Sequence, residues 1–142
     1  SIGVDRMFLS VMCHSYQEEE LEGGDKRIVL RLPAALAPVK CAVMPLVRKE
    51  GLPEKAREIV NLLKFHFNTS YDEKDSIGKR YRRQDAVGTP YCVTVDFDTL
   101  KDNKVTLRHR DTMQQERIDI SELCAHIEDK VSIVSLLKKL QA

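Results

Sequence analysis

The amino-acid sequence predicts an α/β fold in which helices flank a mixed β-sheet. Residues 39–47 are almost all apolar, which is typical of a central strand covered on both faces. Residues 91–97 and 104–110 alternate between apolar and polar side chains, and the polar stretch between them predicts an antiparallel hairpin. Because helical patterns separate the earlier strands and follow the hairpin, we expect one sheet layered with helices.

The chain opens with a predicted helix and a predicted linker. Side chains at helical spacing near the N-terminus are Val4, Met7, Phe8, Val11, Met12 and Ser15. The next segment, 18–27, is acidic and contains Gly23 and Gly24, which break a helix, so we predict a solvated linker. We therefore divide the chain into residues 1–17, the linker 18–27 and a domain over 28–142.

The remaining elements follow in order. Residues 27–32 are a β-type run that Pro33 closes, and Pro45 should end the strand over 39–47 because proline cannot donate to the sheet ladder. The clearest helix carries apolar residues at Ala56, Ile59, Val60, Leu63 and Phe67. Further predictions are a strand at 69–72, a helix from Asp75 or Ser76 to Gly88, a strand at 115–120, and a last helix from Ser121 to Leu140.

Composition and spacing exclude several classes of protein. The 142 residues fit one main domain, and no run of about 18 apolar residues predicts a membrane span. Without a secretory signal pattern, we expect a cytoplasmic protein with no membrane partner. Cysteine and histidine show no CxxC pair and no ligand spacing, so we predict neither a disulfide scaffold nor a metal site. The residues concerned are Cys13, Cys41, Cys92, Cys124, His14, His66, His109 and His126.

The strongest local signal is a basic run on the predicted second helix. It reads Lys79-Arg80-Tyr81-Arg82-Arg83, followed by Gln84 and Asp85. One interpretation is a contact site for phosphates and base edges, with the tyrosine ring available for stacking. The alternative is a solvated helix face whose cations pair with Glu73 and Asp85.

A second basic cluster lies on the predicted strand 104–110. Arg108 and Arg110 project from the same face because side chains alternate along a strand. This pattern either forms a positive patch or protects an edge strand against aggregation. Two basic clusters on adjacent elements favour a nucleic-acid surface, although the formal net charge is only +1. No GxGxxG or Walker loop and no obvious catalytic set accompanies them.

Four stretches of the sequence resemble the anticodon-binding domain of the single-chain-type glycyl-tRNA synthetases. They are residues 30–40, 51–56, 76–99 and 104–113, and the likeness extends over roughly 1–116. The resemblance implies the mixed-sheet fold of class II synthetase anticodon-binding domains. It assigns no role to residues 131–142.

The first six residues resemble the tail of class II motif 3, so the opening helix would be left over from a catalytic domain. The resemblance implies an ATP contact at Gly3, Val4, Asp5 and Arg6, and a glycine contact at Ser1, Ile2 and Gly3. An arginine fits such a role because it donates fixed, charge-assisted bonds to phosphate. The resemblance further implies that the full-length parent enzyme is a homodimer joined through its catalytic domain. This enzyme would ligate glycine to tRNA(Gly) with ATP and Mg. This part alone would bind tRNA, hold no cofactor and be inactive.

Glycine anticodons share two cytosines, whose pairing edge offers an amino donor beside two acceptors. A carboxylate with an arginine complements that edge. The predicted tRNA contacts are Lys79, Arg80, Arg82, Arg83, Gln84, Asp85, Asp96, Asp98, Arg108 and Arg110. The alternative is a non-catalytic, nucleic-acid-binding accessory subunit of a DNA polymerase with the same fold. Arg6 and the run 79–85 favour the synthetase.

Overall fold

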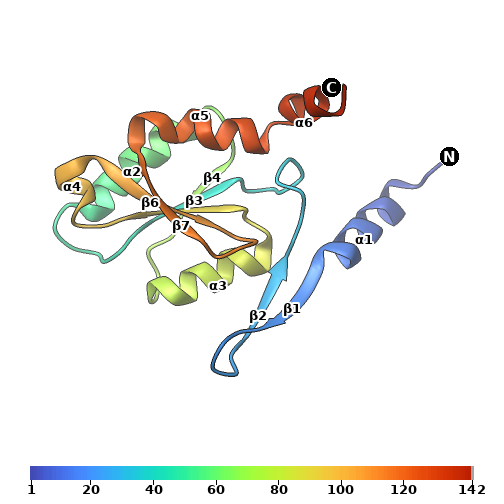
Figure 1. The fold of residues 1–142 in the computed structure, drawn as a ribbon, viewed down its shortest axis with the longest axis horizontal. Helices are drawn as coiled ribbons and strands as arrows, with labels where there is room; N and C mark the ends of the chain where they lie inside the picture. Colours follow the sequence, from blue (N-terminus) through green and yellow to red (C-terminus); the bar gives the residue numbers. More distant parts are fainter. Residues whose placement is uncertain (142) are drawn as a thin grey trace.

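A computed structural model describes residues 1–141 and confirms the mixed sheet. Its five strands lie in the order β4-β3-β5-β6-β7 (Figure 1). β3 pairs in parallel with β4 and β5, whereas β5–β6 and β6–β7 are antiparallel. The strands are β3 (Cys41–Pro45), β4 (Thr69–Tyr71), β5 (Tyr91–Val95), β6 (Lys104–His109) and β7 (Gln115–Asp119). As predicted, Pro45 ends the central strand.

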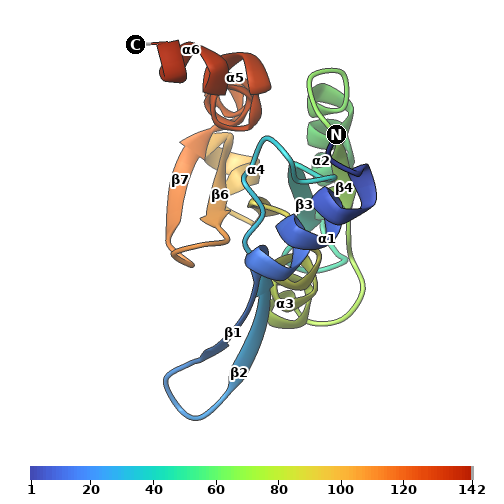
Figure 2. The same cartoon turned by 90° about the vertical axis from the view of Figure 1, so that its right-hand side faces the viewer.

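Helices cover the two faces of the sheet unequally. α2 (Leu52–Leu63) and α5 (Ile120–Val131) lie on one face, and α3 (Ile77–Val87) lies on the other (Figure 1). The main core forms under α2 and α5, where Val43, Val93, Val105 and Leu107 of the sheet are fully buried. α3 packs a smaller apolar group around Met44. Since α3 is a single helix, it leaves the β6–β7 side of its face uncovered by a helix (Figure 2).

The end of α3 depends on a glycine. Gly88 has φ 84°, a left-handed conformation that suits the helix C-terminus. A Cβ atom at this position would lie 3.1 Å from the carbonyl oxygen of Leu30. Gly88 therefore allows β2 to approach the end of α3 closely.

The segment predicted as a linker forms an antiparallel hairpin instead. β1 (Tyr16–Glu20) pairs with β2 (Lys26–Leu30), and the glycines lie in the turn (Figure 2). The acidic residues that suggested solvation include Glu19, which bonds Arg27 of the facing strand. The prediction of an irregular segment over 18–27 is corrected, because opposite charges on facing strands stabilise the pairing. The division of the chain into domains stays a prediction.

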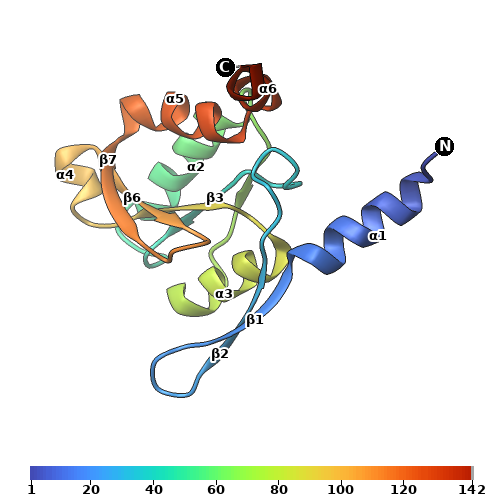
Figure 3. The same cartoon turned by 45° about the vertical axis from the view of Figure 1, so that its right-hand side comes forward.

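The predicted N-terminal helix is confirmed as α1 (Val4–Ser15). It projects away from the sheet (Figure 3). Its apolar side chains have little cover, with Val4 80% and Phe8 65% exposed.

Three local predictions are refined. The connection between β5 and β6 contains a short helix, α4 (Thr99–Asp102). Asp119 caps α5 by accepting a hydrogen bond from the backbone N–H of Ser121, so Ser121 is not the cap. The last predicted helix is divided at Ser132 into α5 and α6 (Ile133–Gln141). Over the described part of the chain, no helix has the length and apolar character needed to cross a membrane.

Candidate nucleic-acid interface

The uncovered part of the α3-side sheet face carries a continuous polar surface. Thr106 pairs with Arg117 across β6 and β7, and Arg108 pairs with Gln115. These four side chains share one face because they alternate with Val105, Leu107 and Glu116 along the strands. Two hollows open on this face, one toward α4 and one toward α3. We call it the α3-side face.

The first hollow has a volume of about 570 Å³ and an acidic rim. Its lining residues are Asp96, Asp98, Lys101, Asp102, Thr106 and Arg117. Three of these side chains bond one another, and we call them the floor: Arg117 donates to Asp96 at 2.6 Å and to both oxygens of Asp102 at 3.1 and 3.0 Å. Asp96 is further fixed by Thr99, whose backbone N–H and hydroxyl both donate to it. These hydrogen bonds hold the side chains of the floor in place.

The rim of this hollow is less constrained than its floor. Within residues 1–141, neither the carboxylate of Asp98 nor the ammonium of Lys101 has a side-chain hydrogen bond or ion pair. One acceptor and one donor are thus available beside this floor. A hollow with these groups can accept a planar polar ring and bond its edge.

The second hollow adjoins the basic run of α3 and has a volume of about 470 Å³. Its lining residues are Gly78, Lys79, Tyr81, Arg82, Arg108, Met113 and Gln115. Lys79 is exposed and Arg82 is half-buried, and neither side chain has an acidic partner in the described part of the chain. These two cations are therefore available for phosphate oxygens.

The tyrosine of the basic run is not available for stacking. Its hydroxyl lies 2.6 Å from the hydroxyl of Thr94, and the guanidinium of Arg108 lies 4.7 Å from the centre of its ring. Burial, opposed by the Thr94 hydrogen bond, raises the pKa of Tyr81. Tyr81 therefore joins α3 to the sheet through its contacts with Thr94 and Arg108.

Five of the predicted tRNA contacts are buried, so their assignment to the surface is corrected. They are Arg80, Gln84, Asp85, Arg108 and Arg110. Arg80 donates to backbone carbonyls of Lys74 and Asp75, and Gln84 accepts from the hydroxyl of Thr89. Their polar atoms bond the protein itself, and burial leaves them little access to an RNA.

The other three buried residues belong to one charged network. Asp85 is fully buried and accepts hydrogen bonds from Arg108 at 2.8 and 3.0 Å and from Arg27 at 3.1 Å. Arg110 donates to the carbonyls of Gly88 and Leu32 at 2.8 and 2.7 Å. This network ties the hairpin, α3 and β6 together. The alternative interpretation, in which Asp85 pairs with a cation on a solvated helix face, is also wrong, because Asp85 is fully buried.

Arg83 is exposed but paired. It donates to Asp72 at 3.0 Å and to Asp75 at 3.2 Å. For Arg83, the alternative interpretation of the basic run is therefore right: it lies on a solvated helix face and pairs with acidic side chains. Its partners are Asp72 and Asp75, whereas the sequence suggested Glu73 and Asp85. Of the ten predicted contacts, Lys79, Arg82, Asp96, Asp98 and the largely buried Arg108 line the two hollows of the α3-side face, and Arg83 lies on the same helix as Lys79.

Sequence reasoning missed Lys101, Thr106, Gln115 and Arg117, which also line the hollows. Strand alternation was the signal that could have identified Arg117, since it places this residue on the face opposite to Ile118.

The residues assigned to ATP and glycine lie at the start of α1. Arg6, with Ile2, Met7, Ser10 and Val11, borders a shallow hollow of about 310 Å³. Arg6 has no side-chain bond to another described residue. The ATP and glycine contacts stay predictions.

Comparison with known proteins decides the family. A family model described as an anticodon binding domain matches residues 40–130. The chain belongs to this family.

The similar proteins agree with that assignment. The glycine–tRNA ligase of Borrelia hermsii is 53% identical over 92% of this chain, and that of Clostridium tetani is 54% identical over the same share. The chain spans 29% and 28% of the lengths of these relatives. The RNA-binding domain of threonyl-tRNA synthetase from Cryptosporidium parvum has a TM-score of 0.64 at 27% identity, covering 70% of this chain and 25% of that one.

The matched region contains the whole candidate interface. Residues 40–130 include the sheet, α2, α3 and nearly all of α5. Both hollows of the α3-side face lie within this anticodon-binding domain. α1, the β1–β2 hairpin and α6 lie outside the matched range.

Proposed function

We propose that this chain binds the anticodon region of tRNA(Gly) as part of a glycine–tRNA ligase. The observation that carries the proposal is the 53–54% identity to glycine–tRNA ligases over 92% of the chain. The α3-side face supplies the physical means, because it combines unpaired cations with a hollow of suitable size. The DNA polymerase alternative gains no support from these relatives.

The two halves of the α3-side face suit different parts of an anticodon loop. Lys79 and Arg82 would contact phosphates, which position the RNA without reading its sequence. Asp98 and Lys101 would bond the edge of a base held over Arg117. A carboxylate accepts from the amino group of cytosine and an ammonium donates to its acceptors, so this rim complements cytosine.

The experiment that tests the function is a binding titration of the chain with tRNA(Gly) against a tRNA of similar size and another anticodon. We expect tighter binding to tRNA(Gly), and a tRNA(Gly) with both anticodon cytosines replaced should lose that advantage. Equal affinity for all three RNAs would contradict the proposal.

The parent enzyme would attach glycine to tRNA using ATP and Mg, in the cytoplasm, as a homodimer joined through its catalytic domain. The exposed apolar side of α1 supports a further domain packing there, since such a stripe is otherwise costly in water. Residues Ser1–Arg6 would contribute to that domain's glycine and ATP sites. This chain alone should not catalyse glycine-dependent pyrophosphate exchange, because catalytic groups act as a set. Measurable exchange would contradict this.

A further inference from the structure

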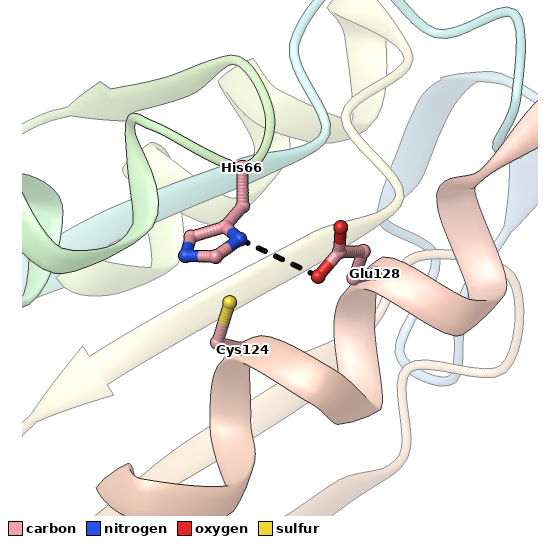
Figure 4. A group of neighbouring side chains, drawn as sticks. All are labelled: His66, Cys124 and Glu128. Atoms are coloured by element: carbon pink, nitrogen blue, oxygen red, sulfur yellow. Dashed lines mark ion pairs between the residues drawn. The ribbon is translucent and has the colours of Figure 1, made fainter.

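A cluster on the opposite side of the sheet joins three side chains of metal-binding type. His66 follows α2, and Cys124 and Glu128 lie one turn apart on α5 (Figure 4). One ligand atom from each lies within 4.8 Å of the other two. Nδ1 of His66 is 3.5 Å from a carboxylate oxygen of Glu128. We propose that His66, Cys124 and Glu128 bind a divalent transition-metal ion of the zinc type.

The chemistry of the three donors selects the class of metal. A thiolate, an imidazole and a carboxylate together suit Zn²⁺ or Co²⁺ better than Mg²⁺ or Ca²⁺, which prefer oxygen alone. Zinc bonds of about 2.0–2.3 Å in a tetrahedron place ligand atoms roughly 3.3–3.8 Å apart. The His66–Glu128 separation already lies in this range. Water would complete the coordination.

The backbone around the cluster is fixed by the core, so only side chains need to move. Leu63 and Phe67 flank His66, and Leu123 and Ile127 alternate with the two α5 ligands; all four belong to the main core. The backbone N–H of His66 also donates to the carbonyl of Leu63 at 2.9 Å. In Figure 4 the Cys124 sulfur lies beside the His66 ring and the Glu128 carboxylate. Because the ligand atoms already lie within 4.8 Å of one another, side-chain rotations that shift them by about 1 Å would bring them to tetrahedral spacing.

The surroundings allow an ion to enter. His66 and Glu128 line a hollow of about 420 Å³ and are exposed to solvent. Lys40 lines the same hollow, but its ammonium donates to the carbonyls of Ala34 and Ala35 at 3.0 and 2.8 Å. Thiol and imidazole ligands must lose a proton to bind a metal, so affinity should fall as the pH falls.

The bound ion would join α5 to the turn after α2. It would stabilise the folded chain, because the separated ligands of the unfolded chain bind it less well. Spacing along the chain predicted no metal site, because His66 is far from Cys124 in the sequence and only the fold brings them together. It does not depend on the proposed tRNA function.

The test is a Co²⁺ titration of the chain carrying Cys13→Ser, which removes the exposed thiol on α1. We expect one ion per chain, with a thiolate-to-cobalt charge-transfer band that Zn²⁺ abolishes. Cys124→Ser should remove the band, and His66→Asn should weaken binding by about tenfold or more. His126→Asn, on the same helix, is the matched control and should bind normally.

A second measurement needs no change at the ligands. Zn²⁺ should protect Cys124 from alkylation, measured by mass spectrometry, and should raise the melting temperature of the chain. Absence of the cobalt band, a band that survives Cys124→Ser, or equal alkylation of Cys124 with and without Zn²⁺ would each overturn the proposal.

Discussion

The carboxylate of Asp85 accepts two hydrogen bonds from the guanidinium of Arg108, at 2.8 and 3.0 Å, with Asp85 fully buried. A third bond comes from Arg27 on the hairpin. One acid at the end of α3 thus holds two arginines from other elements, and the basic character of this region is mostly internal. The surface charge that remains on α3 comes from Lys79, Arg82 and the paired Arg83.

Replacement of Asp85 by Asn should destabilise the chain by about 3–5 kcal/mol, because it leaves two buried guanidinium groups without their counter-charge. Chemical denaturation measures this change. Asp75→Asn is the control, since Asp75 pairs with the exposed Arg83 at the surface and the change should cost less than about 1 kcal/mol. Equal losses for the two variants would contradict the assignment of Asp85 to the core.

The hairpin should loosen in acid. Hydrogen bonds from Arg31 and, more weakly, from Arg27 lower the pKa of Glu19. A lowered pKa contributes stability above the unfolded value of about 4.3, and this is lost as the pH falls through the folded value. The difference in stability between the parent chain and Glu19→Gln should therefore be full at neutral pH and shrink below about pH 4. A difference that stays constant down to pH 3 would contradict this.

Gly88→Ala should destabilise the chain by about 1–3 kcal/mol, because alanine resists a positive φ and its Cβ would crowd Leu30. Gly24→Ala is a useful comparison. Gly24 also has a positive φ, but nothing lies within 4 Å of a Cβ there. Thermal unfolding should show a larger loss for Gly88→Ala, and equal losses would argue against close packing of β2 on α3.

The rate of reaction with a thiol reagent should distinguish the exposed cysteine from the buried ones. Burial raises the pKa of Cys92 to about 12 and that of Cys41 well above its ordinary value. Both should resist a thiol reagent at pH 8 in the folded chain, whereas exposed Cys13 should react at once. Labelling followed by mass spectrometry tells them apart. Rapid labelling of Cys92 without denaturant would contradict the packing of β5.

The sequence predicted the sheet well because its strands carry strong local patterns. The apolar run at 41–45 indicates a strand buried on both faces, and the alternation at 104–109 indicates a strand with one face in the core. The hairpin was missed for the opposite reason. Its strand residues Glu18–Glu20 are locally polar, and only the facing strand and the buried network stabilise them.

The basic patch was only partly predictable. Local composition identifies Lys79–Arg83 as basic, but it does not reveal that Arg80 turns inward to the carbonyls of Lys74 and Asp75. Asp85 is buried because Arg27 and Arg108, both distant in sequence, meet it in the fold. Arg117 was overlooked because it is a single basic residue on its strand and not part of a basic cluster. Its partners Asp96 and Asp102 belong to another segment of the chain.

The rim of the acidic hollow should carry discrimination between bases. Asp98→Ala in the full ligase should reduce discrimination against tRNAs with a replaced anticodon cytosine by about 1–3 kcal/mol at one position. Aminoacylation kinetics with each altered tRNA measure this. Glu73→Ala, an exchange outside both hollows, is the control. Unchanged rejection of both altered tRNAs by Asp98→Ala would remove Asp98 from base reading.

The most direct measurement is the salt dependence of tRNA(Gly) binding by the double variant Lys79→Ala/Arg82→Ala. Each phosphate contact contributes a slope of about −0.7 in log K against log salt for a single strand. Loss of two contacts should make the slope shallower by about 1.4 and weaken binding at low salt. Lys64→Ala, at the end of α2 on the opposite side of the sheet, should keep the parent slope. If the double variant keeps the parent affinity and slope, tRNA does not bind on the α3-side face.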